Sequence, residues 1–538
     1  MKKFILSLLI CLPIFLFAQE KAESVPVIGM EEKDKTATIF ASTIKADEMK
    51  RHLTYLASDE LEGRETGTAG QRKAADYIAA EFKKLGLPTV VNGNSYFQEI
   101  AFSGERWEEI EVNVGKKRFR NLWNFYAFPY TNADSLTINE KEVIFLGYGI
   151  DDSKYSDYAG VNVKGKTVFV YQGEPTNAEG ISYLTGTSTP SDWATDWRKK
   201  LEVAKANGVK TILFIDAKIQ KSISKHRQVL LSPRLQIQET APEGVDFPNN
   251  IFVSTDVIKA ITGRKNKKFI AARDAITKTG KPHNQKFKTK FKLNYKKWKR
   301  QILGSNVLGF IEGTDPKLKD EVVVVTAHYD HLGMKGESIF YGADDNASGS
   351  STVLEIAQAF VEAKKSGVGP RRSVLCMLVS GEEKGLLGSQ YYATFPVFPL
   401  ANTVANVNVD MVGRIDSKHE KANNPNYIYV IGSDRLSTEL HDINENMNKE
   451  YTNIELDYTY NDPKDPNRFY ERSDHYNFAE KGIPAIFYFS GTHVDYHRPS
   501  DTVDKINFEK MEIIGKLIFH TSWQLANQDK RIEVNVGN

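Results

Sequence analysis

The chain has little cysteine and no excess of charge of either sign. Only Cys11 and Cys376 occur in 538 residues, which excludes a disulfide-stabilised scaffold. Lysine and arginine number 71 against 69 acidic residues, so the chain has no general attraction for nucleic acid. The length is more than one ordinary core needs, so we expect two or three domains.

Long apolar runs are also lacking, except at the very start. The first eighteen residues, MKKFILSLLICLPIFLFA, carry two lysines, an apolar run and a small residue before Gln19, a layout typical of a secretory signal peptide. The run is short for a membrane anchor, and no other run of spanning length follows. We therefore expect a bacterial periplasmic or secreted protein without a stable membrane span after cleavage.

The spacing of apolar residues and the frequency of turn residues change along the chain, and these changes predict its domains. Helical spacing marks two early helices around a glycine-rich turn, and a middle region has short strands and turns. The predicted segments are a signal peptide (1–18), a linker (19–45), a catalytic domain in two parts (46–125 and 290–527), an insert (126–289) and a C-terminal tail (528–538).

Residues 286–296 alternate strictly, with Phe287, Thr289, Phe291, Leu293 and Tyr295 on one face and mostly lysines on the other. Basic residues interleaved with aromatics could form a nucleic-acid groove. The interpretation that we favour is an edge strand whose lysines face water. The balanced overall charge supports it, and we expect no nucleic-acid partner.

Residues 296–527 alternate buried strands, such as EVVVVTA and RSVLCMLVS, with helical patterns, including one over 350–364 and another over 508–526. Continuous apolar strands separated by helices predict an α/β fold with a doubly wound, largely parallel sheet flanked by helices.

Candidate ligands follow the strands of this predicted sheet. Ligands bind beyond the carboxyl ends of strands in such folds. The polar residues found there are His328, the pair Glu382 and Glu383, Asp410, His497, and Asp344 with Asp345 in the loop after the first strand. Carboxylates this close repel one another unless cations neutralise them. Imidazole with carboxylate suits zinc, and a shared carboxylate suits two ions.

The motifs AHYDHLG, GADDNASG, SGEEKGLLGS, VDMVGR, YERSDH and YHRPSDT occur in the order found in a known family. The chain resembles the zinc-dependent exopeptidases that include secreted bacterial leucyl aminopeptidases, glutamate carboxypeptidase and the transferrin receptor ectodomain. LEGRETGTAG extends the likeness towards the N-terminus, and the insert resembles a protease-associated domain.

The resemblance implies a site with two zinc ions. His328 and Asp410 would hold one ion, Glu383 and His497 the other, and Asp345 both, with a cis peptide bond after Asp345.

It also implies roles for residues beside the ions. Glu382 would be the general base, Asp330 would orient His328, and Tyr470 would stabilise the oxyanion. His331 is expected to pack or hydrogen-bond near the rim, and Arg414 to contact a carboxylate of either the substrate or the protein.

The predicted function is that of an exported two-zinc aminopeptidase that hydrolyses N-terminal peptide bonds of peptide substrates with a zinc-activated water. Three alternatives stay open: a glutaminyl cyclase-like transferase with one working zinc, a carboxypeptidase of the same fold, and a non-catalytic binding protein. The sequence leaves the oligomeric state and the preferred side chain undetermined.

Overall fold

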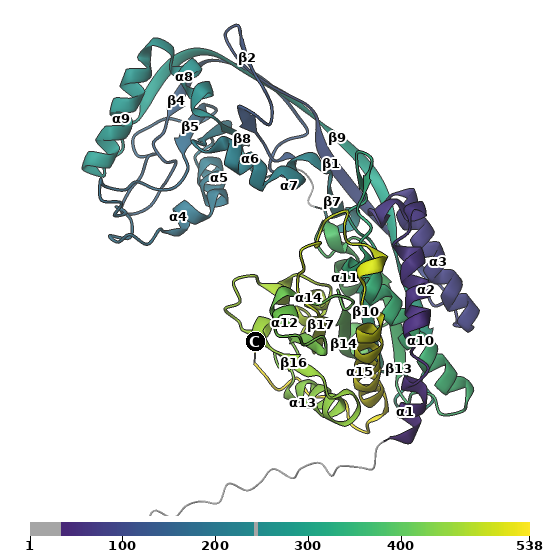
Figure 1. Cartoon of the computed structure of the whole chain (residues 1–538). Helices are drawn as coiled ribbons and strands as arrows, with labels where there is room; N and C mark the ends of the chain where they lie inside the picture. The colour runs from purple at the N-terminus through teal and green to yellow at the C-terminus, as the bar shows by residue number, and fades with distance from the viewer. Residues whose placement is uncertain (1–33, 242–245, 538) are drawn as a thin grey trace, which may run out of the picture.

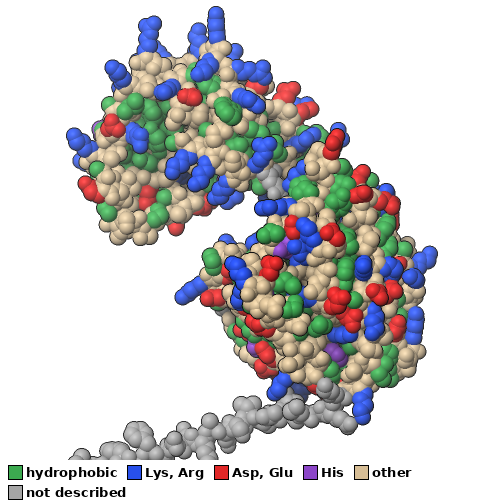
Figure 2. Space-filling model, viewed as in Figure 1, with side chains coloured by type: hydrophobic (Ala, Val, Ile, Leu, Met, Phe, Trp, Pro, Cys, Tyr) green, Lys and Arg blue, Asp and Glu red, His purple; other side chains and the backbone are tan. Residues whose placement is uncertain are grey.

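A computed structural model describes residues 34–241 and 246–537. The predicted signal peptide and residues 19–33 of the predicted linker lie outside the described residues. The chain forms two lobes connected by long strands (Figure 1), with an open notch between the lobes in the space-filling view (Figure 2). Among the described residues, no helix is both long enough and apolar enough to cross a membrane.

The larger lobe is built on a twisted sheet whose strand order is β16-β15-β17-β14-β10-β13-β9. Its central strands β13, β10, β14 and β17 run parallel, whereas β15 is antiparallel to β17. The strands are β10 (Val322–His328), β13 (Ser373–Val379), β14 (Thr403–Val409), β15 (Tyr427–Ile431), β16 (Glu455–Asp457) and β17 (Ala485–Phe489).

Helices cover both faces of this sheet, because alternate residues of β10 enter different cores. Val323 and Val325 pack in one core with α10 (Gly349–Lys365) and α15 (Phe508–Asn527). Val322 and Val324 pack in another core, on the side of α11 (Leu387–Thr394) and α14 (His475–Ala479). The predicted doubly wound α/β fold and the two predicted helices are confirmed.

Two long antiparallel strands connect the lobes. They are β1 (Phe97–Val114) and β9 (Gln285–Ile311), and β9 pairs with β1 on one side and with β4 (Ser135–Phe145) and β13 on the other. The edge-strand interpretation is therefore wrong for residues 291–296, which have a strand partner on both sides, although Phe287 and Phe291 are buried and the lysines between them exposed as expected. The alternation of apolar and basic residues indicates which face of a strand is buried, but it does not indicate whether the strand lies at the edge of its sheet.

The smaller lobe continues the same sheet through β4-β5-β6-β8-β3, with β4, β5, β6 and β8 parallel. Its core includes Val112, Phe119, Phe291 and Tyr295, so the lobe extends beyond the expected limits of 126 and 289 along the strands β1 and β9. Its remaining elements are β2 (Lys117–Phe119), β3 (Phe125–Tyr126), β5 (Thr167–Tyr171), β6 (Thr211–Ile215), β7 (Arg234–Ile237), β8 (Asn249–Val253), α4 (Asp192–Thr195), α5 (Trp197–Ala206), α6 (Ile219–Lys225), α7 (Arg227–Leu231), α8 (Thr255–Thr262) and α9 (Asn266–Thr279).

The N-terminal helices pack on the larger lobe. Residues 35–41, expected in a polar linker, instead form α1 (Lys35–Ala41), because Ala37, Phe40 and Ala41 are buried in the main core. Next come α2 (Ala46–Leu56), η1 (Asp59–Arg64) and α3 (Ala69–Leu85), with α12 (Ser417–Lys421) and α13 (Thr438–Met447) completing the main helices. The Thr68 side chain caps α3 by accepting from the Gln71 N–H, and Gly86 ends it in the left-handed region.

Candidate metal centre and catalytic pocket

The carboxyl ends of four parallel strands meet at one edge of the sheet and bring the predicted ligands together. His328 is the last residue of β10 and lies in register with Val379, the last residue of β13. Glu382 and Glu383 follow β13 directly, Asp410 follows β14, and the loop after β17 carries His497. The strand topology alone therefore gathers these side chains at one edge.

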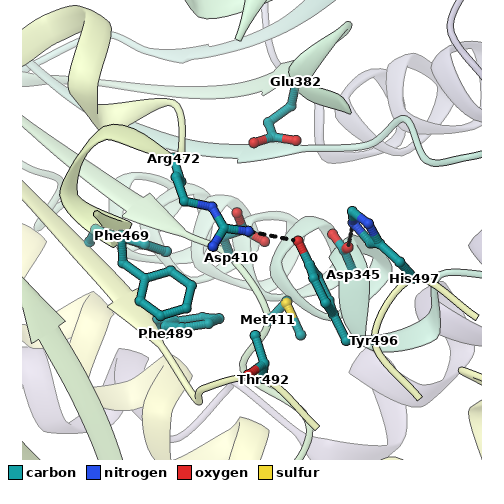
Figure 3. A pocket seen from close by; sticks show the side chains of 11 residues that line it. Asp345, Glu382, Asp410, Met411, Phe469, Arg472, Phe489, Thr492, Tyr496 and His497 are labelled. Atoms are coloured by element: carbon teal, nitrogen blue, oxygen red, sulfur yellow. Dashed lines mark hydrogen bonds and ion pairs between the residues drawn. The ribbon is translucent and has the colours of Figure 1, made fainter. Parts of the chain in front are cut away.

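The gathered side chains form two adjacent sets that share one aspartate. His328 Nε2 lies 3.2 Å from Asp410 Oδ1 and 3.3 Å from Asp345 Oδ1. His497 Nε2 lies 3.0 Å from Asp345 Oδ2 and 3.3 Å from Glu383 Oε1. Asp345 thus presents one carboxylate oxygen to each imidazole (Figure 3 shows it beside His497).

His331 lies within the second set rather than at its rim. Its ring is fully buried, with Nδ1 2.8 Å from Glu383 Oε1 and 3.7 Å from Asp345 Oδ2. Sequence reasoning gave this histidine only a packing or hydrogen-bonding role. The signal that could have found it is its place in AHYDHLG, three residues after His328, where a turn can return the chain to the same site.

The loop that carries Asp345 is fixed by buried hydrogen bonds. The Asp501 carboxylate accepts from the N–H groups of Asp344, at 3.0 Å, and Asp345, at 3.2 Å. Asn346 Oδ1 accepts from the Met411 N–H at 3.1 Å, and the peptide bond between Asp345 and Asn346 is cis, as the resemblance implies.

Arg64 is a fully buried cation beneath this loop, and sequence reasoning missed it. Its guanidinium donates to the carbonyls of Tyr329 at 2.8 Å, Tyr341 at 2.8 Å, Gly342 at 3.0 Å and Leu56. It therefore connects the backbone just after His328 to the backbone just before the Asp345 loop. The only sequence signal was its place in LEGRETGTAG.

Asp330 has a different contact pattern from the expected one. His328 Nδ1 lies 3.1 Å from the Asp330 carbonyl oxygen and 3.9 Å from the carboxylate. The carboxylate itself accepts from the Thr66 hydroxyl at 2.7 Å and from the Glu382 N–H at 3.2 Å. Its backbone therefore orients His328, while its side chain positions the start of the segment that carries Glu382.

Tyr470 lies outside the pocket that adjoins the ligands, contrary to its expected role at the oxyanion. It packs against Gly432 and under Arg435, whose guanidinium carbon is 4.8 Å from the ring centroid. The tyrosine that lines the pocket is Tyr496, whose ring stacks on His497 with centroids 3.9 Å apart. The path of the 455–472 loop, which the sequence does not reveal, decides this difference.

The pocket has an apolar wall and a charged mouth (Figure 3). Met411, Phe469 and Phe489 form part of the wall, and Glu382 lies across the opening from Asp345 and Asp410. Arg472 lies over the Phe469 ring at 4.7 Å and donates to the Tyr496 hydroxyl at 3.2 Å.

Arginine residues near the site have contrasting partners. Arg414 pairs with Asp495 at 3.0 Å and with Asp501 at 3.8 Å, so its partners are carboxylates of the protein. Arg472, in contrast, forms no ion pair with any carboxylate of the described residues, and its side chain is exposed at the mouth.

The electrostatics of the centre suit divalent cations. Burial alone would lower the pKa of His497, but the Asp345 and Glu383 carboxylates raise it to about 10. Burial likewise opposes a charged His328, yet Asp410 and Glu382 hold its pKa well above the usual value. Carboxylates thus set the electrostatics of the centre, and imidazole nitrogens with carboxylate oxygens are donors that zinc prefers. The residues present fit the metal.

The fold and this donor set define a metal-dependent hydrolase of the doubly wound α/β class. Residues 306–522 match the model of peptidase family M28.

Curated relatives and a solved structure are similar to the chain over different lengths. A probable leucine aminopeptidase of Arthroderma otae is 28% identical over 53% of this chain and 81% of its own length. A probable leucine aminopeptidase of Trichophyton verrucosum is 31% identical over 39% of this chain and 56% of its own length. Aminopeptidase YwaD of Bacillus subtilis is 28% identical over 42% of this chain and 46% of its own length. An aminopeptidase from Aneurinibacillus sp. strain AM-1 shares the fold, with a TM-score of 0.56 at 18% identity over 93% of this chain and 98% of that one.

Proposed function

We propose that this protein is an exported two-zinc aminopeptidase that hydrolyses the N-terminal peptide bond of peptides. The observation that carries the proposal is the pair of ligand sets joined by the two oxygens of Asp345. The match of residues 306–522 to peptidase family M28 and the names of the curated relatives support the peptidase activity. Export rests on residues 1–18, and the smaller lobe is proposed to be a protease-associated domain that limits access for long peptides.

Five side chains would hold the ions. His328 and Asp410 would bind one, Glu383 and His497 the other, and Asp345 both. When bound, the ions act as Lewis acids that make a water molecule nucleophilic near neutral pH.

Glu382 is assigned the proton transfers. Its carboxylate lines the pocket, and its Oε2 lies 3.9 Å from His328 Nε2, so it faces the reacting centre without belonging to the five ligands. The hydrogen bond from its N–H to Asp330 fixes the start of its segment. From this position it can accept a proton from the attacking water and return it to the leaving amine.

Tyr496 and Arg472 are assigned to the substrate carbonyl. The hydrogen bond between them holds the tyrosine hydroxyl at the pocket beside His497. A hydroxyl and a guanidinium can both donate to the oxygen on which negative charge develops during attack.

A panel of peptides tests the function. Aminoacyl, N-blocked and N-terminal glutaminyl peptides are incubated with the full chain, with and without chelator. We expect release of N-terminal residues that stops on chelation and on blocking the amine. Cyclisation of the glutaminyl peptide without release of residues would instead identify the transferase.

The variant Glu382→Gln tests the mechanism. It should keep its zinc and lose kcat by about 10²- to 10⁴-fold, the contribution of a positioned general base. Glu202→Gln, an exposed change on α5 in the smaller lobe, is the matched control and should retain full activity. Normal turnover by Glu382→Gln would remove this residue from the mechanism.

A carboxypeptidase is the second candidate, because Arg472 offers an unpaired cation at the mouth of the pocket. Arginine recognises a terminal carboxylate through paired hydrogen bonds. This alternative predicts that N-blocked peptides are cleaved, that amidation of the C-terminus abolishes cleavage, and that Arg472→Gln raises KM for free acids only.

A further inference from the structure

A second histidine–carboxylate cluster lies on α12 and β16, away from the residues that line the catalytic pocket. It consists of His419, Glu455 and Asp457, and we refer to it as the α12–β16 cluster. His419 Nε2 lies 3.5 Å from Asp457 Oδ2 and 3.8 Å from Glu455 Oε1. One ligand atom from each residue lies within 4.8 Å of the other two.

The atom of each side chain that does not face the cluster is held by a separate partner. His419 Nδ1 lies 2.8 Å from Asp416 Oδ1. Asn424 donates to Glu455 Oε2 at 2.7 Å, and the Thr459 N–H donates to Asp457 Oδ1 at 2.8 Å. The three remaining atoms, one nitrogen and two oxygens, are therefore aimed at one another.

The imidazole of His419 is the strongest part of the case. Its side chain is only 2% exposed, and Nε2 has no hydrogen-bond partner among the described residues. The Asp416 carboxylate can only accept a hydrogen bond from Nδ1, so Nε2 is the ring nitrogen that faces the carboxylates of Glu455 and Asp457. A carboxylate behind the opposite ring nitrogen is also the arrangement that orients metal-bound histidines.

The Lys418 ammonium would compete with a bound cation for the Asp457 carboxylate. Its ammonium contacts Asp457 Oδ2, but it forms no ion pair with Glu455. The Lys418 side chain is 55% exposed, so it can move into water when another cation binds.

We propose that the α12–β16 cluster binds a divalent transition-metal ion such as Zn²⁺, with His419 Nε2, Glu455 Oε1 and Asp457 Oδ2 as ligands. Tetrahedral zinc with bonds of about 2.0 to 2.2 Å places its ligand atoms roughly 3.4 Å apart, close to the 3.5 and 3.8 Å that separate His419 Nε2 from the two carboxylate oxygens. An imidazole donor does not suit Ca²⁺ or Mg²⁺, which prefer oxygen.

The ion would fix one end of the segment that lines the catalytic pocket. β16 is a three-residue strand at the edge of the sheet, and Asp457 is its last residue. After it, Tyr460 packs between Tyr429 and Phe469, with ring centroids 4.4 and 4.7 Å apart, and Phe469 lines the pocket. Binding would therefore tie β16 to α12 and stabilise the wall of the pocket.

Metal counting on the full chain tests the proposal. The protein is dialysed against Zn²⁺, and bound zinc is measured per chain for the wild type, Glu455→Gln and Glu420→Gln. Glu420 lies on α12 beside His419, is exposed and has no part in the cluster, so it is the matched control. We expect Glu455→Gln to bind one ion fewer than the other two proteins.

Lys418→Gln provides an independent measurement. It removes the competing ammonium and leaves all three ligands, so it should lower the Kd for the additional Zn²⁺ about tenfold, whereas Glu420→Gln leaves this Kd unchanged. The difference of one ion does not depend on how many ions the catalytic centre holds. Equal zinc counts for the wild type and Glu455→Gln, or an unchanged Kd for Lys418→Gln, would overturn the proposal.

Discussion

Replacing Arg64 with leucine tests whether this buried cation holds the metal centre together. The guanidinium donates to four backbone carbonyls, which lie just after His328, before the Asp345 loop and at the end of α2. Leucine keeps an apolar stem but provides no donor. The carbonyls of Tyr329 and Gly342 would then be buried without these partners, and the two ligand loops would no longer be connected.

The magnitude follows from the number of hydrogen bonds and from the burial of the charge. A hydrogen bond to a charged group contributes about 1.5 to 3 kcal/mol, so four lost bonds set an upper limit of roughly 6 to 12 kcal/mol. Removing the guanidinium also removes the cost of burying it, and burial lowers the pKa of Arg64 to about 10. We therefore expect a net loss of about 3 to 5 kcal/mol, the range for breaking a buried charged contact.

Urea unfolding with matched variants measures this loss. Arg72→Leu, an exposed arginine on α3, should change the free energy of unfolding by less than about 0.5 kcal/mol. Arg64→Lys keeps the charge but has fewer donors than carbonyls, so its stability should lie between those of the wild type and Arg64→Leu. Zinc content should fall in the same order. Arg64→Leu with wild-type stability and zinc content would refute the reasoning.

Three further predictions concern conformation, acid stability and the metal. Gly342→Ala should reduce zinc content and activity, because φ is +57° there and a Cβ would lie 2.2 Å from the Asp345 carbonyl; normal zinc content would contradict this. Burial lowers the pKa of His475 to about 3 from 6.5. Between these two pH values the imidazole is protonated in the unfolded chain and neutral in the folded chain. The free energy of unfolding should therefore fall by about 1.4 kcal/mol for each unit by which the pH is lowered. His475→Phe should flatten that slope in unfolding experiments, and an unchanged slope would exclude this residue. Chelation should lower Tm by exposing the repulsion among the buried carboxylates, and added zinc should restore it; a Tm insensitive to chelator would count against a metal centre.

The sequence predicted the sheet and the convergence of the candidate ligands because both depend on local patterns and chain order. A continuous apolar run such as VVVVTA is buried on both sides only in a sheet that helices cover on both faces. The carboxyl ends of parallel strands then meet at one edge of that sheet. His328, Glu383 and Asp410 were therefore predictable, since each lies at or within four residues after the end of such a strand.

Only the tertiary structure decided which side chains from distant segments complete the site. Tyr496 lines the pocket and Tyr470 does not, His331 lies inside a ligand set, and Arg64 reaches across from the N-terminal segment. The same limit applies to β9, whose alternation is compatible with either an edge or an interior strand. Periodicity records the faces that are buried, whereas the partners across each face depend on loop paths and long-range packing that no local pattern contains.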